Sequence, residues 1–469
     1  MENVNTLTST AEEMDKAYDE SLEIVEQYIE EKKYSLCRDE LLKHDEVEIS
    51  EMLTEIKRDY DLQKVVVMFR TLPKDVSVEV FSYLDVDDQV DIINMITDPE
   101  IEFILEELDF DDMIDVLEEL PANVVDKILS KTPKAERKKI NQFLKYKDDT
   151  AGSLMTPDYI NLTKSWTVRE ALDHIKEVGL DSETIYSCYV IDRGRKLIGV
   201  VSLRALVICD DNMLVSDIMH DDPLCVHVDE DQEEVMDLFN RYGYLAIPVV
   251  DNEARLVGIV TVDDILDVIE EETSEDIERM GGVISNDDKS YLDMSVWSHV
   301  KARFPWLLLL MCSYFVTGGI ISSFENALSD MICLVTYMPL LMGTAGNSGT
   351  QSSTLVIRGM ATGDIELDDF IKVAWKEIRV SVTVGLCLSV INTARIVFIT
   401  HEPFLVAVTV CLSMIIAIMI AKLIGAMLPM IAKKIGIDPA LMAGPLMASI
   451  TDMLALGTYF LMAGIFLHI

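Results

Sequence analysis

The sequence predicts a multidomain protein: an all-α superhelical domain, an α/β paired module, a connecting helix and a five-helix, all-α transmembrane domain. Three observations predict this order. Apolar residues recur at helical spacing over residues 19–147, an alternation of strands and helices occurs twice over residues 151–270, and long apolar stretches follow from residue 304. A chain of 469 residues has room for roughly three ordinary domains.

The first domain is predicted to be a stack of short helices. Segments 76–84, 89–96, 100–108 and 111–120 each have one apolar and one strongly acidic face, and stops such as Leu72-Pro73 and Leu120-Pro121 separate them. This pattern is typical of a small helical superhelix. A solvated surface is the simpler interpretation of any single acid. Residues 1–18 show no organised pattern and are expected to be a mobile tail.

Charge is distributed very unevenly along the chain. The formal net charge of −43 lies entirely in residues 1–300, whereas residues 301–469 are balanced. An acidic excess of this size argues against nucleic-acid binding and favours cations as partners. The opening stretch is polar and acidic, so no cleavable leader is expected and this half should remain in the cytoplasm. The eight cysteines form no C-x-x-C pair, which argues against a disulfide frame or a zinc site.

The paired module consists of two copies, residues 151–210 and 211–270. Residues 197–202 are echoed by residues 256–261, and Met155 is echoed by Met219. The second copy ends with Gly258, Thr261 and Asp264, and this spacing resembles the tandem CBS (cystathionine β-synthase) domain. The resemblance implies that an adenine nucleotide such as ATP is a candidate ligand near Thr261 and Asp264. In the first copy Ala205 occupies the position of the acid.

An acidic helix is expected to leave the second copy and to form a connecting region over residues 265–300. Seven acids follow Asp264 on this stretch: Asp267, Glu270, Glu271, Glu272, Glu275, Asp276 and Glu278. Such a run is usually a solvated face. Its place between a regulatory module and a membrane domain also makes it a candidate coupling element.

Five apolar stretches are each long enough to cross a hydrocarbon core of about 30 Å. They cover residues 304–324, 331–357, 378–399, 404–430 and 439–467. Basic residues precede the first stretch and lie between the second and third and between the fourth and fifth, whereas the alternate connections have none. The positive-inside rule therefore predicts a multi-pass protein of the cytoplasmic membrane with a cytoplasmic N-terminus and an external C-terminus.

The second stretch contains a polar segment, residues 343–354, in which no apolar residue is larger than alanine. Its glycines either allow a neighbouring helix to approach closely or bare backbone carbonyls where the helix breaks. Helix packing alone explains the glycines. It does not explain Asn347, Gln351 and the nearby hydroxyls, which favour water or an ion.

The fifth stretch carries a carboxylate at membrane depth. Asp452 lies 13 residues beyond Pro439, which is roughly 20 Å along a helix. A charge at this depth is costly unless it meets a cation, water or a hydrogen-bond donor, so an ion pathway is favoured over a structural hydrogen bond or a protonated acid. Asp438 directly precedes Pro439, an arrangement typical of a helix N-cap.

The whole chain from about residue 19 resembles the MgtE family of magnesium channels and transporters. The resemblance depends on the domain order, on residues 346–359, on Asp438-Pro439-Ala440-Leu441, and on Gly444-Pro445 followed by Asp452. It implies a homodimer in the lipid bilayer, with five spans per subunit and a pore on the dimer axis. Asp452 would face the ion, and carbonyls near Gly343, Gly346 and Asn347 would complete the site.

The resemblance also implies a cytosolic magnesium sensor. The matching acids are Glu79, Asp111, Asp115, Asp264, Asp267, Glu272 and Glu275. Gly243 stands where relatives carry an aspartate, so one bridging site is expected to differ. Independently of the family, acidic modules repel each other until cations fill the gaps. Low Mg²⁺ should separate the modules, and high Mg²⁺ should draw them together.

The resulting prediction is a dimeric Mg²⁺ channel, not an enzyme, that closes when cytosolic Mg²⁺ is high. Mg²⁺ keeps its octahedral water shell, so a pore can hold it with few direct ligands, and Co²⁺, Ni²⁺ and Mn²⁺ are candidate further ions. One alternative is a carrier that couples divalent-cation movement to Na⁺ or H⁺. A second is a membrane-anchored nucleotide or ion sensor without transport, against which the polar segment in the second stretch argues.

Overall fold

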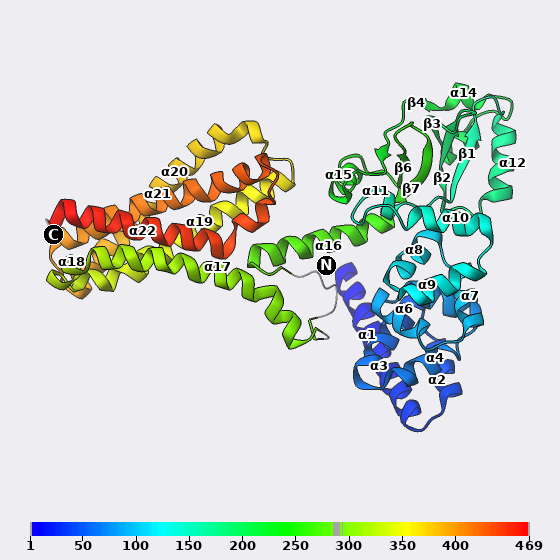
Figure 1. Cartoon of the computed structure of the whole chain (residues 1–469), viewed down its shortest axis with the longest axis horizontal. Helices are drawn as coiled ribbons and strands as arrows, with labels where there is room; N and C mark the ends of the chain where they lie inside the picture. Colours follow the sequence, from blue (N-terminus) through cyan, green and yellow to red (C-terminus); the bar gives the residue numbers. More distant parts are fainter. Residues whose placement is uncertain (1, 285–290, 293, 468–469) are drawn as a thin grey trace. The chain divides into compact units, whose positions relative to one another are not determined.

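The computed structural model describes residues 2–284, 291–292 and 294–467 (Figure 1). The chain forms two compact units, Met1–Ile269 and Glu270–Ile469. The expected connecting region, residues 265–300, includes residues 285–290 and 293, which lie outside the described part. Each unit is treated separately below.

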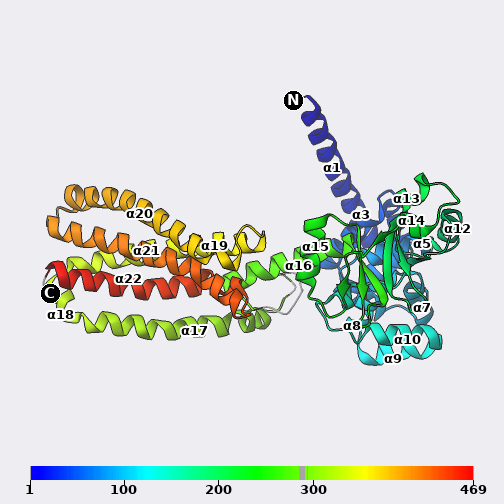
Figure 2. The ribbon, with the colours of Figure 1, turned by 90° about the horizontal axis from the view of Figure 1, so that it is seen from above.

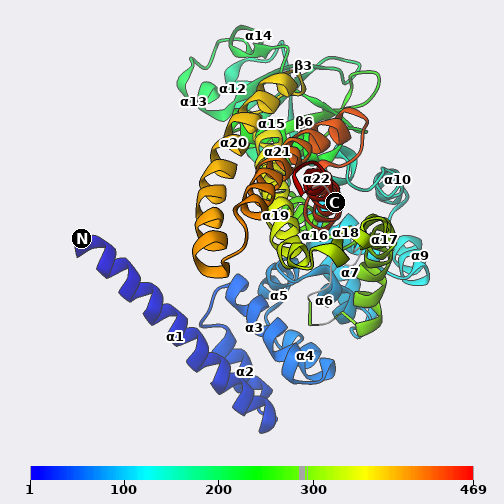
Figure 3. The ribbon, with the colours of Figure 1, turned by 90° about the vertical axis from the view of Figure 1, so that its left-hand side faces the viewer.

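Ten helices open the N-terminal unit: α1 (Glu2–Glu30), α2 (Tyr34–Leu41), α3 (Glu46–Asp59), α4 (Leu62–Phe69), α5 (Lys74–Ser82), α6 (Val86–Ile93), α7 (Asp98–Glu107), α8 (Phe110–Glu119), α9 (Ala122–Lys131) and α10 (Lys134–Phe143). The four predicted amphipathic segments correspond to α5–α8 within a few residues. Pro73, Pro121 and Pro133 occupy the N-cap positions of α5, α9 and α10, which explains why the helices are short. Figure 3 shows α1 beside α2 and α3.

Residues 1–18, expected to be a mobile tail without an organised pattern, include the start of a helix. Residues 2–18 form the beginning of α1, which continues without a break to Glu30. Residues 1–30 contain neither glycine nor proline, so nothing in the backbone interrupts a helix there. Apolar residues do recur at helical spacing here, at Val4, Leu7, Ala11, Met14 and Tyr18, so the periodic signal was present and the prediction overlooked it.

The paired module follows in the same unit. Its elements are α11 (Ala151–Leu154), β1 (Tyr159–Thr163), α12 (Val168–Val178), β2 (Thr184–Ile191), β3 (Leu197–Ser202), α13 (Leu203–Ile208), α14 (Val215–Ile218), β4 (His220–Asp221), β5 (Val226–His227), α15 (Gln232–Tyr242), β6 (Ala246–Val250) and β7 (Leu256–Thr261). The strands form two sheets, in the orders β1-β2-β3-β4 and β5-β6-β7. In each sheet the first pair is parallel and the next is antiparallel, which confirms the internal repeat.

The two copies exchange segments. A Cβ atom on Gly258 of the second copy would lie 2.8 Å from Sδ of Met155, and a Cβ on Gly199 of the first copy would lie 2.9 Å from Sδ of Met219. The backbone of Thr156 also pairs with Ile259 of the other copy in both directions, at 2.8 and 2.9 Å. The predicted echo of Met155 by Met219 therefore marks two methionines that each cover a glycine in the opposite half.

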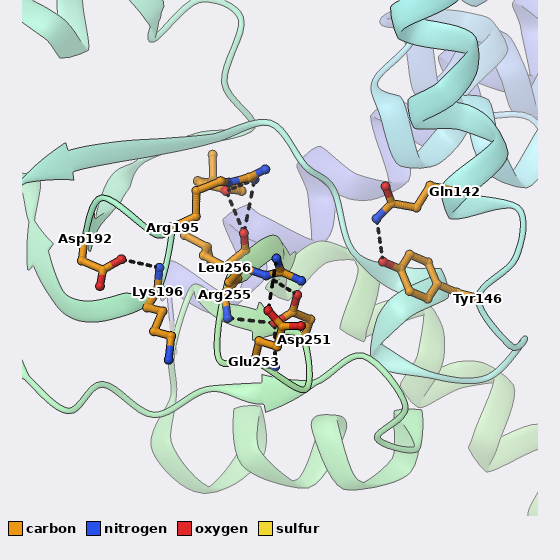
Figure 4. A network of polar contacts seen from close by, with 10 residues as sticks. Gln142, Tyr146, Asp192, Arg195, Lys196, Asp251, Glu253, Arg255 and Leu256 are labelled. Carbon is orange, nitrogen blue, oxygen red and sulfur yellow. Dashed lines mark hydrogen bonds and ion pairs between the residues drawn. The ribbon is translucent and has the colours of Figure 1, made fainter.

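The hairpin turns of the two copies meet each other (Figure 4). The guanidinium of Arg195 donates to the carbonyl of Leu256 at 3.3 Å, and the amide of Leu256 donates to the carbonyl of Arg195 at 2.9 Å. Within the second turn Arg255 pairs with Asp251 at 2.8 Å. These contacts tie the two halves into one body.

One long helix, α16 (Val262–Gly281), follows β7 directly and carries the acidic run, as expected. Gly243 ends α15 with a φ of 65°, in the left-handed region that glycine adopts without strain. The glycine at this position therefore has a structural explanation, because an aspartate would have to adopt the same conformation.

The C-terminal unit contains α17 (Val296–Ser323), α18 (Glu325–Asp330), α19 (Cys333–Ala361), α20 (Phe370–Arg395), α21 (Phe404–Lys434) and α22 (Gly444–Leu467), with short turns Leu367–Asp369, Ile396–Thr400 and Pro439–Met442. Four segments of the described chain are long and apolar enough to cross a membrane: Val296–Ser323, Leu367–Thr400, Phe404–Lys434 and Ala440–Leu467. Helix α19 is 29 residues long but includes the polar segment 343–354. Its role as a fifth span stays a prediction.

Helix α19 packs against α21 and α22, and α20 packs against α21 (Figure 2). Alanines 345, 417, 421 and 455 form a small-residue core where α19, α21 and α22 meet. A Cβ on Gly425 of α21 would collide with the carbonyl oxygen of Gly349 on α19. Helix α19 is unbroken, so Gly346 and Gly349 serve close packing rather than a helix break, whereas Gly343 lies on an exposed face.

Candidate functional site

Carboxylates from three places converge in the N-terminal unit, and we call this group the acidic cluster. Its members are Asp109, Asp111, Asp112, Glu183, Asp263, Asp264 and Asp267. The first three lie at the start of α8, Glu183 directly precedes β2, and the last three lie in the first turns of α16. The helical domain and the paired module thus both contribute to it.

Asp111 is the most strongly affected member. Its Oδ1 atom is buried and accepts no hydrogen bond within the described part of the chain. Burial raises the pKa of Asp111 well above its usual value, and the nearby charges of Asp264 and Glu183 raise it further. A buried carboxylate oxygen without a donor is costly, so this position favours a proton or a cation.

Two neighbours share this environment. Burial, followed by repulsion from Asp109 and Asp264, raises the pKa of Asp112 to about 6. Burial and the same two carboxylates raise the pKa of Glu183 to about 7. The largest influences on both groups are desolvation and other acids, which means that the protein leaves this negative charge largely uncompensated.

Asp264 has a structural role beside the electrostatic one. Its Oδ2 atom accepts hydrogen bonds from the hydroxyl of Thr261 at 2.6 Å and from the amide of Thr261 at 3.2 Å. These contacts fasten the start of α16 to the end of β7. The predicted nucleotide pair, Thr261 and Asp264, is therefore in mutual contact.

The acidic cluster is not a preformed chelate. Among the residues that the structure describes, no group of three or more His, Cys, Asp and Glu side chains has an arrangement ready to hold a metal ion. Mg²⁺ usually retains several waters and is bound by one or two carboxylates. Such an ion fits a loose acidic gap better than a tight cage.

The structure gathers only part of the predicted sensor set. Asp111, Asp264 and Asp267 lie in the acidic cluster. Asp115 is exposed one turn further along α8, and Glu79 is exposed on α5. Glu272 and Glu275 lie on the part of α16 that belongs to the second unit, so the structure does not assign them to the cluster.

The prediction missed Asp109, Asp112, Glu183 and Asp263. The sequence signal for three of them is adjacency, because they neighbour Asp111 and Asp264 at the starts of α8 and α16. Glu183 has no such signal. It joins the cluster only because the fold brings the start of β2 close to these helix ends.

The end of α16 is tied to the C-terminal unit, of which residues 270–281 form part. Arg279 donates to Asp438 Oδ2 at 2.6 Å and also pairs with Glu275. Oδ1 of Asp438 accepts from the amide of Ala440 at 2.7 Å, which confirms its predicted N-cap role. Asp438 thus holds both the turn before α22 and the connecting helix.

The predicted pore residues lie on α19 and α22. A Cβ on Gly346 would lie 3.6 Å from Oδ1 of Asp452, so the carboxylate lies close to the side-chain-free face of α19 at this glycine. Asp452 is partly exposed. Gly343 and Asn347 lie on an exposed face of α19, which we call the polar stripe; it comprises Gly343, Asn347, Gln351, Thr354 and Arg358. The 3.6-residue period of the helix aligns these positions.

Comparison with known proteins identifies the family. Family models match residues 44–149 (MgtE intracellular N domain), residues 151–209 and 215–271 (CBS domain) and residues 338–462 (divalent cation transporter MgtE). The magnesium transporter MgtE of Thermus thermophilus is 37% identical over 406 residues, 86% of this chain and 89% of the relative. The chain belongs to the MgtE family.

Two further likenesses accompany this one. The magnesium transporter MgtE of Bacillus subtilis is 33% identical over 416 residues, 86% of this chain and 91% of the relative. A crystal structure of the cytosolic domain of the Mg²⁺ channel MgtE in complex with ATP is 34% identical, covers 52% of this chain and 98% of that chain, and has a TM-score of 0.48. With its four long apolar helices, this member of the MgtE family is a membrane protein.

Proposed function

We propose that this member of the MgtE family is a homodimeric Mg²⁺ channel of the cytoplasmic membrane that imports Mg²⁺ and closes when cytosolic Mg²⁺ is high. The observation that carries the proposal is the position of the Asp452 carboxylate close to Gly346, beside the exposed polar stripe of α19. The relatives that match most of the chain are named magnesium transporters, which fits a non-enzyme that moves this ion.

The single chain leaves the polar stripe of α19 without cover. Lipid tails are poor neighbours for an amide and a guanidinium, so a second copy or water is the natural partner for Asn347, Gln351 and Arg358. Two copies around one axis would supply two Asp452 carboxylates. This charge matches a hydrated divalent cation, which needs few direct ligands. Co²⁺, Ni²⁺ and Mn²⁺ meet the same donors.

The acidic cluster supports the gating part of the proposal. Cations that enter it relieve the repulsion among Asp111, Asp112 and Glu183, and therefore stabilise the state in which α8, β2 and α16 converge. The same helix α16 continues to Arg279, which donates a hydrogen bond to Asp438 of the C-terminal unit. Mg²⁺ binding at one end of α16 would thus bias the other end.

An adenine nucleotide such as ATP is a candidate second effector of the paired module. Thr261 and Asp264 would have to exchange their mutual hydrogen bonds for bonds to a ribose, and Asp264 also belongs to the acidic cluster. Nucleotide and Mg²⁺ would therefore influence each other through one carboxylate.

The proposed orientation places the N-terminus in the cytoplasm and the C-terminus outside.

The test is Mg²⁺ flux into liposomes that contain the purified full chain, without Na⁺ or H⁺ gradients. We expect flux in the parent and its loss, by about tenfold or more, in Asp452→Ala and Asp452→Asn. Asp368→Asn, an exposed acid of the same unit, is the matched control and should keep the parental flux. Flux that survives both Asp452 substitutions would remove this carboxylate from the ion path.

The same assay separates the alternatives. Flux that appears only with a Na⁺ or H⁺ gradient would favour a coupled carrier, because Asp452 can serve either mechanism. A parent without flux under any gradient would favour a membrane-anchored sensor. The gating proposal requires that millimolar Mg²⁺ on the cytosolic side stops the flux in the parent. In Asp111→Asn the flux should persist under the same condition.

A further inference from the structure

A lysine lies buried among the helices of the membrane unit. Lys422 of α21 is 5% exposed, and it lies 12 residues before the end of that helix, roughly 18 Å along it. A buried ammonium at such depth is costly unless it has a partner, and it marks a functional position by default. The path suggested by Asp452 and the polar stripe does not account for this residue.

Its partners come from two other helices. The ammonium of Lys422 donates to the hydroxyl of Ser352 on α19 at 3.3 Å, and the same hydroxyl donates to Oε2 of Glu377 on α20 at 2.7 Å. Ser352 is 1% exposed and Glu377 is half-buried. One serine hydroxyl therefore joins a cation and an anion through charge-assisted hydrogen bonds and links α19, α20 and α21.

The place of Ser352 on α19 connects this network with the polar stripe. At 3.6 residues per turn, Ser352 lies about 140° around the helix from the centre of the stripe. The residues next to it on the buried side, Gly349 and Ser353, face the helix interface. A bond that fixes Ser352 towards α20 and α21 therefore fixes the rotation that directs Asn347 and Gln351 outwards.

The chemistry argues against a cation site at this serine. The ammonium already occupies the position from which a metal ion would approach the hydroxyl, and like charges repel strongly in a region of low dielectric. One oxygen of Glu377 already accepts the hydrogen bond of this serine, so Glu377 is not a free ligand for a metal ion. A positioning role fits this arrangement, whereas ion binding does not.

We propose that Lys422 is a positioning residue for the ion path: through Ser352 it compensates Glu377 and holds α19 with its polar stripe turned outwards. The inference rests on the proposed transport function for its effect on flux. Its structural content is that Lys422 and Glu377 act as a pair, so removing one charge is damaging while removing both is tolerated.

The experiment compares four variants of the full chain in liposomes: Lys422→Met, Glu377→Gln, the double variant, and Lys434→Met as the control. Lys434 is an exposed lysine at the end of the same helix. We expect Lys422→Met to lower Mg²⁺ flux about tenfold, the double variant to recover to within about threefold of the parent, and the control to be unchanged. A double variant as inactive as Lys422→Met would overturn the pairing.

Ser352 provides a second arm. Ser352→Thr keeps a hydroxyl and should keep most of the flux, whereas Ser352→Ala removes the bridge and should behave like Lys422→Met. Equal flux in the two serine variants would contradict the bridge.

A third readout does not need transport. Gln351→Cys, in a background without the exposed cysteines 225, 312 and 387, should react with a membrane-impermeant thiol reagent. We expect Lys422→Met to lower this labelling and the double variant to restore it. If the variants show this labelling pattern but the parent carries no flux, only the proposed function is contradicted. If Lys422→Met leaves the labelling unchanged, the positioning role is contradicted.

Discussion

The acidic cluster and the Lys422–Ser352–Glu377 network treat buried carboxylates in opposite ways. In the network, the hydroxyl of Ser352 donates a hydrogen bond to the carboxylate of Glu377 and accepts one from the ammonium of Lys422. In the acidic cluster the largest influences on Asp112 and Glu183 are burial and further acids, and an oxygen of Asp111 accepts no hydrogen bond among the described residues. The protein supplies its own counter-charge where the arrangement must be permanent, and leaves it to the solution where the arrangement must respond.

The two regions also differ in their access to ions from solution. Inside a membrane no mobile ion can enter a packed interface, so a half-paired charge has no remedy other than a protein partner. In the N-terminal unit, cations and protons reach the surface freely, and a repulsive gap can wait for them. Uncompensated charge is therefore a usable signal in the acidic cluster and a folding defect in a packed interface between membrane helices.

The largest expected effect comes from placing a second, uncompensated carboxylate among the helices of the C-terminal unit. Lys422→Glu would place a second carboxylate beside Ser352 and Glu377, and we expect the yield of monodisperse protein to fall by about tenfold or more. Gel filtration of the purified protein measures this, with Lys434→Glu as the control. Normal folding of Lys422→Glu, or its rescue by millimolar Mg²⁺, would break the contrast between the two regions.

The reverse exchange should have an intermediate effect. Asp112→Lys gives the acidic cluster a permanent cation, so it should protect the N-terminal unit from protease without Mg²⁺ and reduce the further protection by Mg²⁺. We expect the half-time of cutting in EDTA to lengthen about fivefold. Glu119→Lys, an exposed acid at the end of the same helix, is the control. Protection by Mg²⁺ that is unchanged in Asp112→Lys would place the responsive site elsewhere.

The smallest effect expected is a pH dependence. The folded pKa values of about 6 for Asp112 and about 7 for Glu183 lie above the ordinary values of 3.8 and 4.5. The folded state therefore binds more protons than the unfolded state between about pH 4 and 7, and its stability falls as pH rises through this window. Above pH 7 the effect should level off.

Hydrogen exchange of α8 in the full chain, corrected for the intrinsic rate, measures this dependence. In EDTA we expect protection about tenfold higher at pH 5 than at pH 7.5, and recovery of that protection at pH 7.5 with Mg²⁺. Helix α12 is the internal reference. Protection that rises with pH would reverse the sign of the linkage and contradict an uncompensated cluster.

The sequence predicted most of the fold because its signals are local. Helical period, proline stops and the repeat around Gly199 and Gly258 each depend on neighbouring residues, and these elements appear as expected. The start of α1 was the exception: residues 1–18 were expected to be a mobile tail, although their apolar residues recur at helical spacing.

The sites were less accessible to sequence reasoning because they are long-range. Asp111 and Asp264 were among the predicted sensor residues, but Glu183 joins them only through the packing of a strand end against two helices. Lys422 was hidden among apolar residues in a stretch interpreted only as a membrane span. Its significance depends on Ser352 and Glu377, which lie 70 and 45 positions earlier in the chain.

The exchange of Met155 and Met219 between the two copies of the paired module sets an order for protein synthesis. The first sheet lacks its edge strand β4 until residues 220–221 have left the ribosome, and Met155 has no glycine to cover until residue 258 follows. Neither half can finish folding alone. The acidic cluster can form only when the first turns of α16 have emerged, shortly before the first long apolar helix begins at Val296.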